Sequence, residues 1–567
     1  FQPNSIAVAG ASERPGSVGN ALMRNLIERG FAGKIYPINP NRKTIWNLPA
    51  CASIGELKTV VDLVVICTPI SLTPRIIKEC AESGVGGAVI ISAGGKEIGE
   101  KGKKLEADIT KAADRSGLRI IGPNCVGVMA GRSKLNASFA SQAPLPGKMA
   151  FVSQSGAICT AILDLSIREN IGFSYFVSLG DMLDVDFGDM IDYLGGEPEV
   201  SSIVMYVESL THIRKFMSAA RAVSRIKPII ALKAGRTRAG ALAAASHTGA
   251  LAGEDSIYDA ALQRAGILRV KTFEELFDCA ELLAKQPKPK GPGLAIITNA
   301  GGPGVMAADT LSDYGYEPVE LSQDSLKKLD EILPPFWSKR NPIDMLGDAS
   351  AELYRKVVKI CMQAKEIDGL LIMSAPQALT DPSQAAAGLV DLIRDQSIPI
   401  ITSWVGGADM KKGTEVFNQG GIPTFDTPER AVRAFMDIYR FSQNIEMLQQ
   451  VPSRLPRRLE FDRQEARALI QAKLKVKNGL LTEIESKALL SAYGISANRV
   501  ETAFSGRGAV EKAKRMGLPV VMKINSGDIS HKSDAGGVVL DLKNEQEVSK
   551  AFEQIMQSAK SYNSEAR

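Results

Sequence analysis

Short runs rich in Val and Ile alternate along this chain with longer amphipathic stretches, and this alternation restricts the fold more than any other feature. Strands of a parallel sheet read as continuous apolar runs because helices cover both faces of the sheet. The first set predicts strands at 5–10, 34–38, 62–67, 87–92 and 118–122, separated by helices near 18–29, 73–83 and 99–116. We therefore expect an α/β fold built from βαβ units.

The same pattern restarts after each of two later boundaries. Further strands are predicted at 148–152, 173–178, 201–207 and 227–233, and then, after a Lys/Pro-rich linker at 286–293, at 293–298, 368–373 and 398–402. A basic, polar segment from about 443 to 475 separates a last piece with a helix near 482–493 and strands at 518–523 and 537–542. The pattern predicts three consecutive doubly wound domains at 1–140, 141–287 and 291–450, and a smaller one at 475–567.

Composition excludes several classes of protein. A net charge of +5 over 567 residues gives no reason to expect a nucleic acid or a membrane surface as partner. The apolar runs fall short of the roughly 18–20 residues that a membrane span needs. The chain begins at Phe1 without a signal-peptide pattern, and its seven cysteines include no Cys-x-x-Cys pair. We expect reduced thiols and a cytoplasmic protein.

The most reactive pattern surrounds one of the three histidines. His247 lies in the run Ala-Ala-Ala-Ser-His-Thr-Gly-Ala-Leu-Ala-Gly, where small and hydroxylated residues flank the imidazole. A neutral imidazole is nucleophilic near pH 7 and can carry a phosphoryl group. A buried structural histidine remains the alternative, although such a residue more usually lies among larger apolar side chains. His212, at a helix start, is interpreted as a surface or capping residue.

The turn after the first strand is rich in glycine and opens a helix. It reads Gly-Ala-Ser-Glu-Arg-Pro-Gly-Ser-Val-Gly from residue 10, so backbone N–H groups at the positive helix end could receive a phosphate. NAD is a poor match because the second strand ends in Ile38-Asn39-Pro40, with no acidic group for a ribose diol. Lys43 suits a phosphate, so a phosphorylated nucleotide other than NAD is favoured. A generic strand–helix turn is the alternative.

Two further loops follow the same logic in later domains. Both place small residues and bare N–H groups between a parallel strand and a helix, where dipole and hydrogen bonds would stabilise a transferring phosphoryl group. A phosphoryl group clasped between two such helix ends is the interpretation we favour. The candidate phosphate-binding residues are Ser153, Gln154, Ser155 and Gly156 in the second domain, and Gly301, Gly302 and Gly304 in the third.

These motifs together resemble the NDP-forming acyl-CoA synthetases, the succinyl-CoA synthetase superfamily. The resemblance rests on GASERPGSVGN, Ile38-Asn39-Pro40 with Lys43, Thr68-Pro69, Gly122-Pro-Asn-Cys125, SQSGA and SHTGALAG, and the order of the motifs is that of the single-chain ADP-forming acetate–CoA ligases. It implies a Rossmann-like CoA-binding domain, two flavodoxin-like domains of which the first carries a phosphohistidine, and a partial ATP-grasp domain. It also implies small-molecule substrates, and a homo-oligomer because the family pairs its domains across subunits.

The implied reaction is acyl-CoA + ADP + phosphate ⇌ carboxylate + CoA + ATP, through an acyl phosphate and phosphorylated His247, whose loop then moves to the nucleotide site. Glu208, after the strand at 201–207, matches the carboxylate that holds the histidine ring, and His531 matches a second, nucleotide-side histidine. Lys523 is the candidate for nucleotide phosphate. The implied CoA-binding residues are Gly10, Ser12, Arg14, Val18, Asn39, Lys43, Thr68, Pro69 and Asn124.

The sequence also departs from the family pattern. Asp181 stands after Ser178-Leu179-Gly180, where the family usually has Asn, so acyl preference is open. The chain ends at Arg567, before the lobe that brings most Mg²⁺ ligands in the family. A truncated chain, an unresolved remainder and a partner subunit are the alternatives, and no residue of this chain is predicted as a metal ligand. A CoA-sensing scaffold of a protein acetyltransferase, a plain nucleotide-binding protein and an oxidoreductase remain competing functions, and the presence of His247 argues against the sensor.

Overall fold

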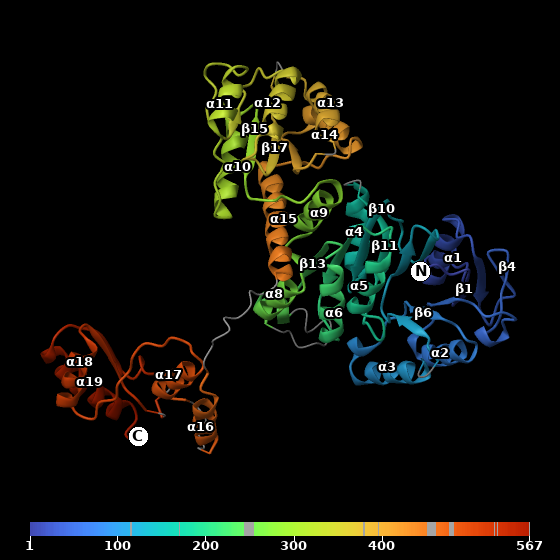
Figure 1. The fold of residues 1–567 in the computed structure, drawn as a ribbon. Helices are drawn as coiled ribbons and strands as arrows, with labels where there is room; N and C mark the ends of the chain where they lie inside the picture. Colours follow the sequence, from blue (N-terminus) through green and yellow to red (C-terminus); the bar gives the residue numbers. More distant parts are fainter. Residues whose placement is uncertain are drawn as a thin grey trace. The chain divides into compact units, whose positions relative to one another are not determined.

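The structure is a computed structural model, and it describes residues 1–113, 116–168, 171–242, 254–377, 380–394, 396–450, 461–475, 481–526, 528–529 and 531–565. The chain divides into two compact units, Phe1–Gln450 and Val451–Arg567. Each unit is an α/β structure, and Figure 1 traces the elements in chain order.

The first sheet has five parallel strands in the order β2-β1-β5-β6-β7. All five predicted strands are present, because each apolar run is buried between helix layers. A small hairpin of β3 (Thr44–Ile45) and β4 (Leu48–Pro49) was not predicted. The strands are β1 (Ser5–Ala9), β2 (Lys34–Ile38), β5 (Leu63–Ile66), β6 (Gly87–Ile90) and β7 (Arg119–Ile121), and the helices are α1 (Val18–Glu28), α2 (Thr73–Glu82) and α3 (Glu100–Ala113).

The second sheet has seven strands in the order β14-β13-β12-β10-β11-β8-β9. Its parallel part is β10 (Leu145–Ser153), β11 (Gly172–Ser178), β12 (Ser202–Val207), β13 (Ile229–Lys233) and β14 (Leu268–Val270). Two antiparallel strands, β8 (Gly127–Ala130) and β9 (Leu135–Ser138), extend it at one edge. The described helices of this segment are α4 (Gly156–Arg168), α5 (Phe187–Gly196), α6 (Ile213–Val223), α8 (Asp255–Arg264) and α9 (Phe273–Lys285).

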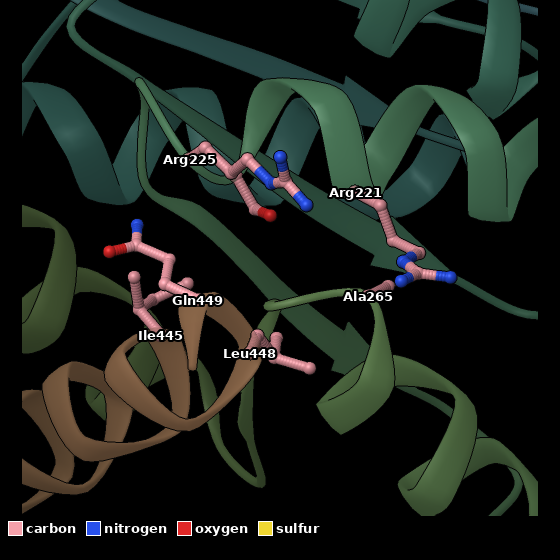
Figure 2. Close-up of a pocket in the computed structure, with 7 residues that line it drawn as sticks. Arg221, Arg225, Ala265, Ile445, Leu448 and Gln449 are labelled. Atoms are coloured by element: carbon pink, nitrogen blue, oxygen red, sulfur yellow. The ribbon is translucent and has the colours of Figure 1, made fainter. Parts of the chain in front are cut away.

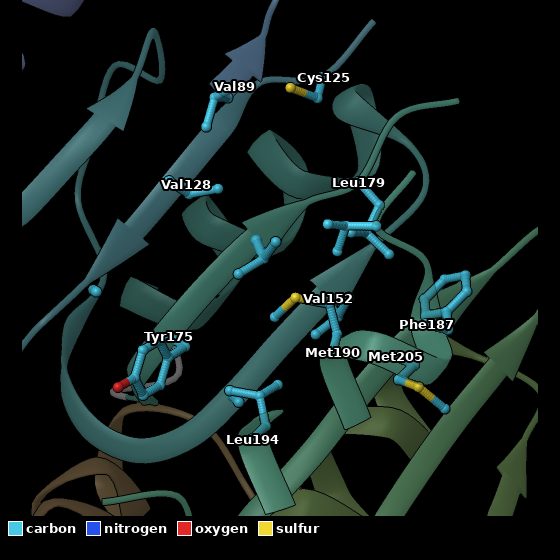
Figure 3. Close-up of a cluster of buried hydrophobic side chains, with 14 of the residues drawn as sticks. Val89, Cys125, Val128, Val152, Tyr175, Leu179, Phe187, Met190, Leu194 and Met205 are labelled. Carbon is cyan, nitrogen blue, oxygen red and sulfur yellow. The ribbon is translucent and has the colours of Figure 1, made fainter. Parts of the chain in front are cut away.

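Strands β8 and β9 lie inside the range 1–140 that the sequence predicts as the first domain, yet they pair with the second sheet. Val128 of β8 faces Val177 of β11 in the antiparallel register. The sequence pattern predicts no strand between residues 122 and 148, because two strands of four residues each give too short a pattern. One core cluster contains Val89 of β6, Val128 of β8 and Val152 of β10, so the first two sheets share a core (Figure 3).

The third sheet is parallel throughout, in the order β16-β15-β17-β18-β19. Its strands are β15 (Leu294–Thr298), β16 (Ile343–Asp344), β17 (Gly369–Ser374), β18 (Ile400–Trp404) and β19 (Thr424–Phe425). The three predicted strands are the long ones, and the two-residue strands β16 and β19 were missed because they are too short to give a pattern. The helices are α10 (Gly301–Asp313), α11 (Gln323–Asp330), α12 (Ala351–Gln363), α13 (Pro382–Ile393), α14 (Ala408–Gln419) and α15 (Pro428–Gln449).

Helix α15 joins the second and third sheets into one body. Phe277 of α9 and Phe435 of α15 belong to one core cluster that draws on both sheets. At this contact Arg430 donates two hydrogen bonds to Asp278, from Nε to Oδ2 at 3.1 Å and from Nη2 to Oδ1 at 2.7 Å. Asp278 is 5% exposed, so its charge depends on this bidentate partner.

The second unit is smaller and has its own core. Its elements are α16 (Arg463–Leu474), α17 (Glu483–Ala492), α18 (Gly506–Met516), β20 (Val520–Lys523), β21 (Val538–Leu542) and α19 (Glu545–Tyr562). Helices α18 and α19 pack against the antiparallel pair β20–β21 around a cluster that includes Ala513, Leu542 and Ala551. In the described parts of both units, no helix has the length and apolar character that crossing a bilayer requires.

The Asp278–Arg430 pair gives a test of how the second and third sheets are held together. Arg430→Met leaves a buried carboxylate without its partner, and we expect the free energy of unfolding to fall by about 3 kcal/mol. Urea denaturation measures the loss. Adding Asp278→Asn removes the unpaired charge, so the double variant should recover part of the stability. Equal stability of the wild type and the single variant would contradict this account.

Candidate functional site

The carboxyl ends of the first sheet form one continuous edge. Gly10, at the end of β1, has a φ of +96°, and a Cβ there would lie 3.1 Å from Thr68 Cγ2. Ser92 donates a side-chain hydrogen bond to the carbonyl oxygen of Thr68, and the N–H of Asn124 donates to Ser92 O at 3.0 Å. The predicted CoA-binding residues Gly10, Thr68 and Asn124 are therefore brought together near the point between β1 and β5 where the strand order reverses, which is where doubly wound sheets bind ligands.

Asn39 lies at the same edge, after β2, and its side chain bonds to the backbone of the loop that follows β1. Its Nδ2 donates to Ala11 O at 2.9 Å, and its Oδ1 accepts from the N–H of Asn41 at 2.9 Å. The side chain thus shapes the glycine loop, in which Ser12 Oγ also accepts from the N–H of Arg14 at 3.0 Å. Thr68 Oγ1 is buried and has no hydrogen-bond partner within the described part of the chain. The remaining predicted residues Arg14, Val18, Lys43 and Pro69 are exposed.

In the second sheet, the strand β10 ends in a tightly bonded loop. Ser153 Oγ donates to the carbonyl oxygen of Ser155 at 2.9 Å and accepts from its N–H at 3.1 Å. Helix α4 then starts at Gly156, whose added Cβ would lie 3.1 Å from the side chain of Val126. The start of α4 therefore carries its positive dipole end beside an apolar neighbour, which is favourable for an anion.

Gln154 links this loop to Glu208. The N–H groups of Glu208 and Ser209 donate to Gln154 Oε1 at 3.0 and 2.9 Å, and Gln154 Nε2 donates to Ser209 Oγ at 3.0 Å. Gln154 is 8% exposed, and Glu208 is half-buried after β12. The predicted phosphate loop and the predicted carboxylate thus meet at one edge of the sheet.

The third sheet repeats the loop. Thr298 Oγ1 donates to Ala300 O at 2.8 Å and accepts from its N–H at 3.0 Å, which matches the bonding of Ser153. The helix start differs, since an added Cβ at Gly301 would lie 3.4 Å from Asp344 Oδ2. A carboxylate beside Gly301 partly neutralises this helix end. Gly301 and Gly302 are exposed and Gly304 is buried, so the two predicted anion sites are not equivalent.

The predicted nucleophile, His247, lies outside the residues that the structure describes. The strand next to Glu208 carries a residue that the sequence interpretation missed. Lys233 ends β13 at 6% exposure, pairs with Val207 of β12, and its Nζ lies 4.4 Å from the centre of the Tyr258 ring. Burial, and to a smaller extent Arg269, lowers the pKa of Lys233. The sequence signal that could have identified Lys233 is a lysine at the end of an otherwise apolar strand.

In the second unit, Lys523 belongs to a cluster of three lysines around one carboxylate. Glu483 Oε1 lies 3.1 Å from Lys523 Nζ and 3.0 Å from Lys487 Nζ, and Glu483 Oε2 lies 3.8 Å from Lys532 Nζ. His531 precedes Lys532 in an exposed turn, where its carbonyl oxygen accepts from the N–H of Ala535 at 3.3 Å. The cluster has an excess of positive charge, as a nucleotide phosphate requires.

Three carboxylates of the first unit meet where the first two sheets adjoin. Glu97, Glu106 and Asp181 lie within ion-binding reach of one another, and no other such group occurs in the described part of the chain. Lys96 binds this group twice, by an N–H that donates to Glu106 at 2.8 Å and by an ion pair of 3.8 Å with Asp181. Burial raises the pKa of Asp181 to about 7, and Glu97 adds to the rise, whereas Lys96 opposes it.

A small pocket lies between α6 and α15 (Figure 2). Arg221 and Arg225 reach it from α6 and the turn after α6, and Ala265 lies in the turn before β14. These segments precede β13 and β14, so the pocket is at the amino ends of the strands, away from Ser153 and Glu208. It contains none of the predicted site residues.

Four family models match consecutive parts of the chain. A CoA binding domain matches residues 4–131, a succinyl-CoA ligase like flavodoxin domain matches 146–283, a Ligase-CoA domain matches 294–449, and an ATP-grasp domain matches 472–567.

Relatives match over the whole length. The ADP-forming acetate–CoA ligase I of Archaeoglobus fulgidus is 38% identical over 100% of this chain and 81% of its own length. The ADP-forming 4-hydroxybutyrate–CoA ligase of Nitrosopumilus maritimus is 36% identical over 100% of this chain and 81% of its own. A structure of the dinucleotide-forming acetyl-coenzyme A synthetase 1 of Ca. Korarchaeum cryptofilum, with phosphate and ADP, has a TM-score of 0.76 at 36% identity, over 80% of this chain and 98% of that one.

The raised pKa of Asp181 predicts a pH dependence of stability. The unfolded chain ionises this carboxyl near pH 4, whereas the folded protein keeps the proton until about pH 7. Its contribution to stability is complete below about pH 4 and is lost as the pH rises to 7. Relative to the wild type, Asp181→Asn should gain about 1–3 kcal/mol between pH 5 and pH 8. Thermal denaturation at several pH values measures this, and parallel profiles would contradict it.

Proposed function

This chain belongs to the NDP-forming acyl-CoA synthetases, and on that premise we propose that its two sheet edges in the first unit carry acyl and phosphoryl transfer through phosphorylated His247. The chain is an ADP-forming acyl-CoA ligase of the acetate–CoA ligase type, with CoA-binding, flavodoxin-like and ATP-grasp domains. The reaction is acyl-CoA + ADP + phosphate ⇌ carboxylate + CoA + ATP. No relative reported above supports the alternative of a CoA-sensing regulatory scaffold.

The chemistry divides into three transfers. An oxygen of phosphate attacks the thioester carbonyl, the C–S bond breaks, and CoA leaves with a proton while an acyl phosphate forms. A ring nitrogen of His247 then attacks phosphorus, and the carboxylate leaves as the P–O bond breaks. Finally an oxygen of the ADP β-phosphate attacks, and the P–N bond breaks to give ATP. A covalent intermediate replaces one difficult transfer by easier ones.

The observation that carries the proposal is the carboxyl edge of the second sheet. There Gln154, which lies just before the start of α4, accepts hydrogen bonds from the N–H groups of Glu208 and Ser209, so the helix start and the backbone of Glu208 are held at the same end of the sheet. The helix end suits the transferring phosphoryl group. Glu208 would accept the other ring N–H of His247, fix the tautomer and stabilise the phosphorylated ring.

The other predicted residues take their roles from the same scheme. We assign CoA to the edge formed by Gly10, Thr68 and Asn124 in residues 1–140. We assign phosphoryl transfer to the domain at 141–287. The domain at 291–450 would contact phosphate through a second helix end, and the domain at 475–567 would bind the nucleotide. Lys523 and His531 would serve the nucleotide, with Lys523 in the lysine cluster at Glu483.

The family and the free cysteines also suggest the metal ion, the oligomeric state and the cellular compartment of this protein. We propose that Mg²⁺ accompanies the nucleotide, that the protein forms a homo-oligomer, and that it works in the cytoplasm. All seven cysteines are free, which suits a reducing compartment. The acyl group is open, since the relatives above are named for acetate and for 4-hydroxybutyrate.

Phosphoenzyme formation tests the function directly. The protein is mixed with radiolabelled phosphate and acetyl-CoA or a panel of other acyl-CoAs, and acid-labile label is mapped. We expect label on His247 with at least one thioester. His247→Asn should lose the label, because the nucleophile is gone, and keep CoA affinity within about threefold. Label that persists in the variant would refute the covalent scheme, and bound CoA without label from any thioester would favour the sensor.

The role of His531 has its own test. In His531→Ala we expect the phosphoenzyme to form normally and to discharge to added ADP at least about tenfold more slowly, because the nucleotide-side relay is lost. Loss of label after ADP addition measures the discharge. His212→Ala is the matched control, since His212 is exposed and bonded to Asp186 in the first unit. Normal discharge from His531→Ala would remove His531 from the path.

A further inference from the structure

Gln154 follows the last residue of β10, where the sequence suggested a phosphate ligand. We propose instead that its side chain is a positioning residue, which fixes the peptide of Glu208 and so holds the Glu208 carboxylate in the place that the proposed function requires. This inference rests on the proposed function, because it explains how one of the residues of that scheme is held.

The hydrogen bonds of Gln154 are directed at the Glu208 loop. Its Oε1 accepts two N–H groups, from Glu208 at 3.0 Å and from Ser209 at 2.9 Å, and these use both lone pairs of an amide oxygen. Its Nε2 donates to Ser209 Oγ at 3.0 Å, and its own backbone N–H donates to Tyr206 O at 3.2 Å. At 8% exposure the side chain is almost withdrawn from solvent and from ligands.

These bonds fix a distance that catalysis needs. Gln154 lies between Ser153 and Ser155, whose mutual hydrogen bonds shape the loop before α4. The same residue therefore holds the anion-binding helix start and the backbone of Glu208. Without its amide, two N–H groups lose their acceptor and the loop after β12 is free to shift. A shift of about 1 Å in a reacting arrangement can cost a hundredfold in rate.

The third sheet contains the same clamp without the carboxylate. The N–H of Ala375 donates to Asn299 Oδ1 at 2.8 Å, and Asn299 Nδ2 donates to Ala375 O at 3.0 Å. Asn299 follows Thr298 as Gln154 follows Ser153, and Ala375 follows β17 as Glu208 follows β12. The clamp is thus common to both sheets, while the carboxylate at the clamped position belongs to the second sheet alone. Asn299 provides a matched control.

The kinetic test uses Gln154→Met, which keeps the length of the side chain and removes the amide. The rate of phosphoenzyme formation is measured at saturating acyl-CoA over a range of phosphate concentrations. We expect the maximal rate to fall at least about tenfold, with half-saturation by phosphate changed less than about twofold. Combined with Glu208→Gln, the variant should lose little more than Glu208→Gln alone, because both act through one carboxylate. The proposal would be overturned if Gln154→Met raised the phosphate concentration for half-saturation and if the losses in rate of Gln154→Met and Glu208→Gln multiplied in the double variant.

Backbone hydrogen exchange provides a readout that does not depend on activity. In Gln154→Met the N–H groups of Glu208 and Ser209 should exchange faster, and that of Ala375 should not change. In the control Asn299→Leu, the N–H of Ala375 should exchange faster and those of Glu208 and Ser209 should not change. The maximal rate of this control should still depend on Glu208. Unchanged exchange at 208–209 in Gln154→Met overturns the positioning role alone. A wild-type protein that forms no phosphoenzyme overturns the proposed function and this role with it.

Discussion

Parallel strand pairing is the constraint on which the arrangement of this protein depends. Each parallel strand must be followed by a connection that returns the chain to the opposite edge of the sheet, and helices make those connections. All carboxyl ends therefore gather on one edge, together with the starts of the helices that follow. Gly10 and Thr68 meet on the first sheet for this reason, and Ser153 and Glu208 meet on the second. Neither pair is close in sequence.

Strands that consist of a long apolar run could be predicted from the sequence. Short strands, which are defined by the strands they pair with, could not. The run at 368–373 became β17 at Gly369–Ser374, since a strand covered on both faces must be apolar throughout. In contrast, the sequence predicted no strand between residues 122 and 148, and only the structure shows that β8 and β9 form and pair with the second sheet. The fold and the activity class followed from motifs that resemble those of the family, and the relatives confirm both.

Candidate residues for the site could be proposed from the sequence, whereas the hydrogen bonds between them could not. The motif made Gln154 a candidate phosphate-binding residue, but only the structure gives the direction of its amide, because that depends on a backbone more than fifty residues away. Lys233 was overlooked since a strand-end lysine usually reaches solvent. The two helix ends looked alike in sequence, yet Val126 adjoins one and Asp344 the other. Such differences arise between segments distant in the chain, and local patterns do not contain them.

The crossing of β8 and β9 into the second sheet bears on how such enzymes exchange parts during evolution. A recombination between relatives at residue 140 would graft a second sheet whose two edge strands come from a different parent. Cross-strand contacts such as Val128 with Val177 would then be mismatched. A junction before Gly127 keeps the seven strands together. A chimaera joined before Gly127 therefore keeps the strand pairing of the second sheet intact, even though that boundary lies inside the range 1–140 that the sequence predicts as a single domain.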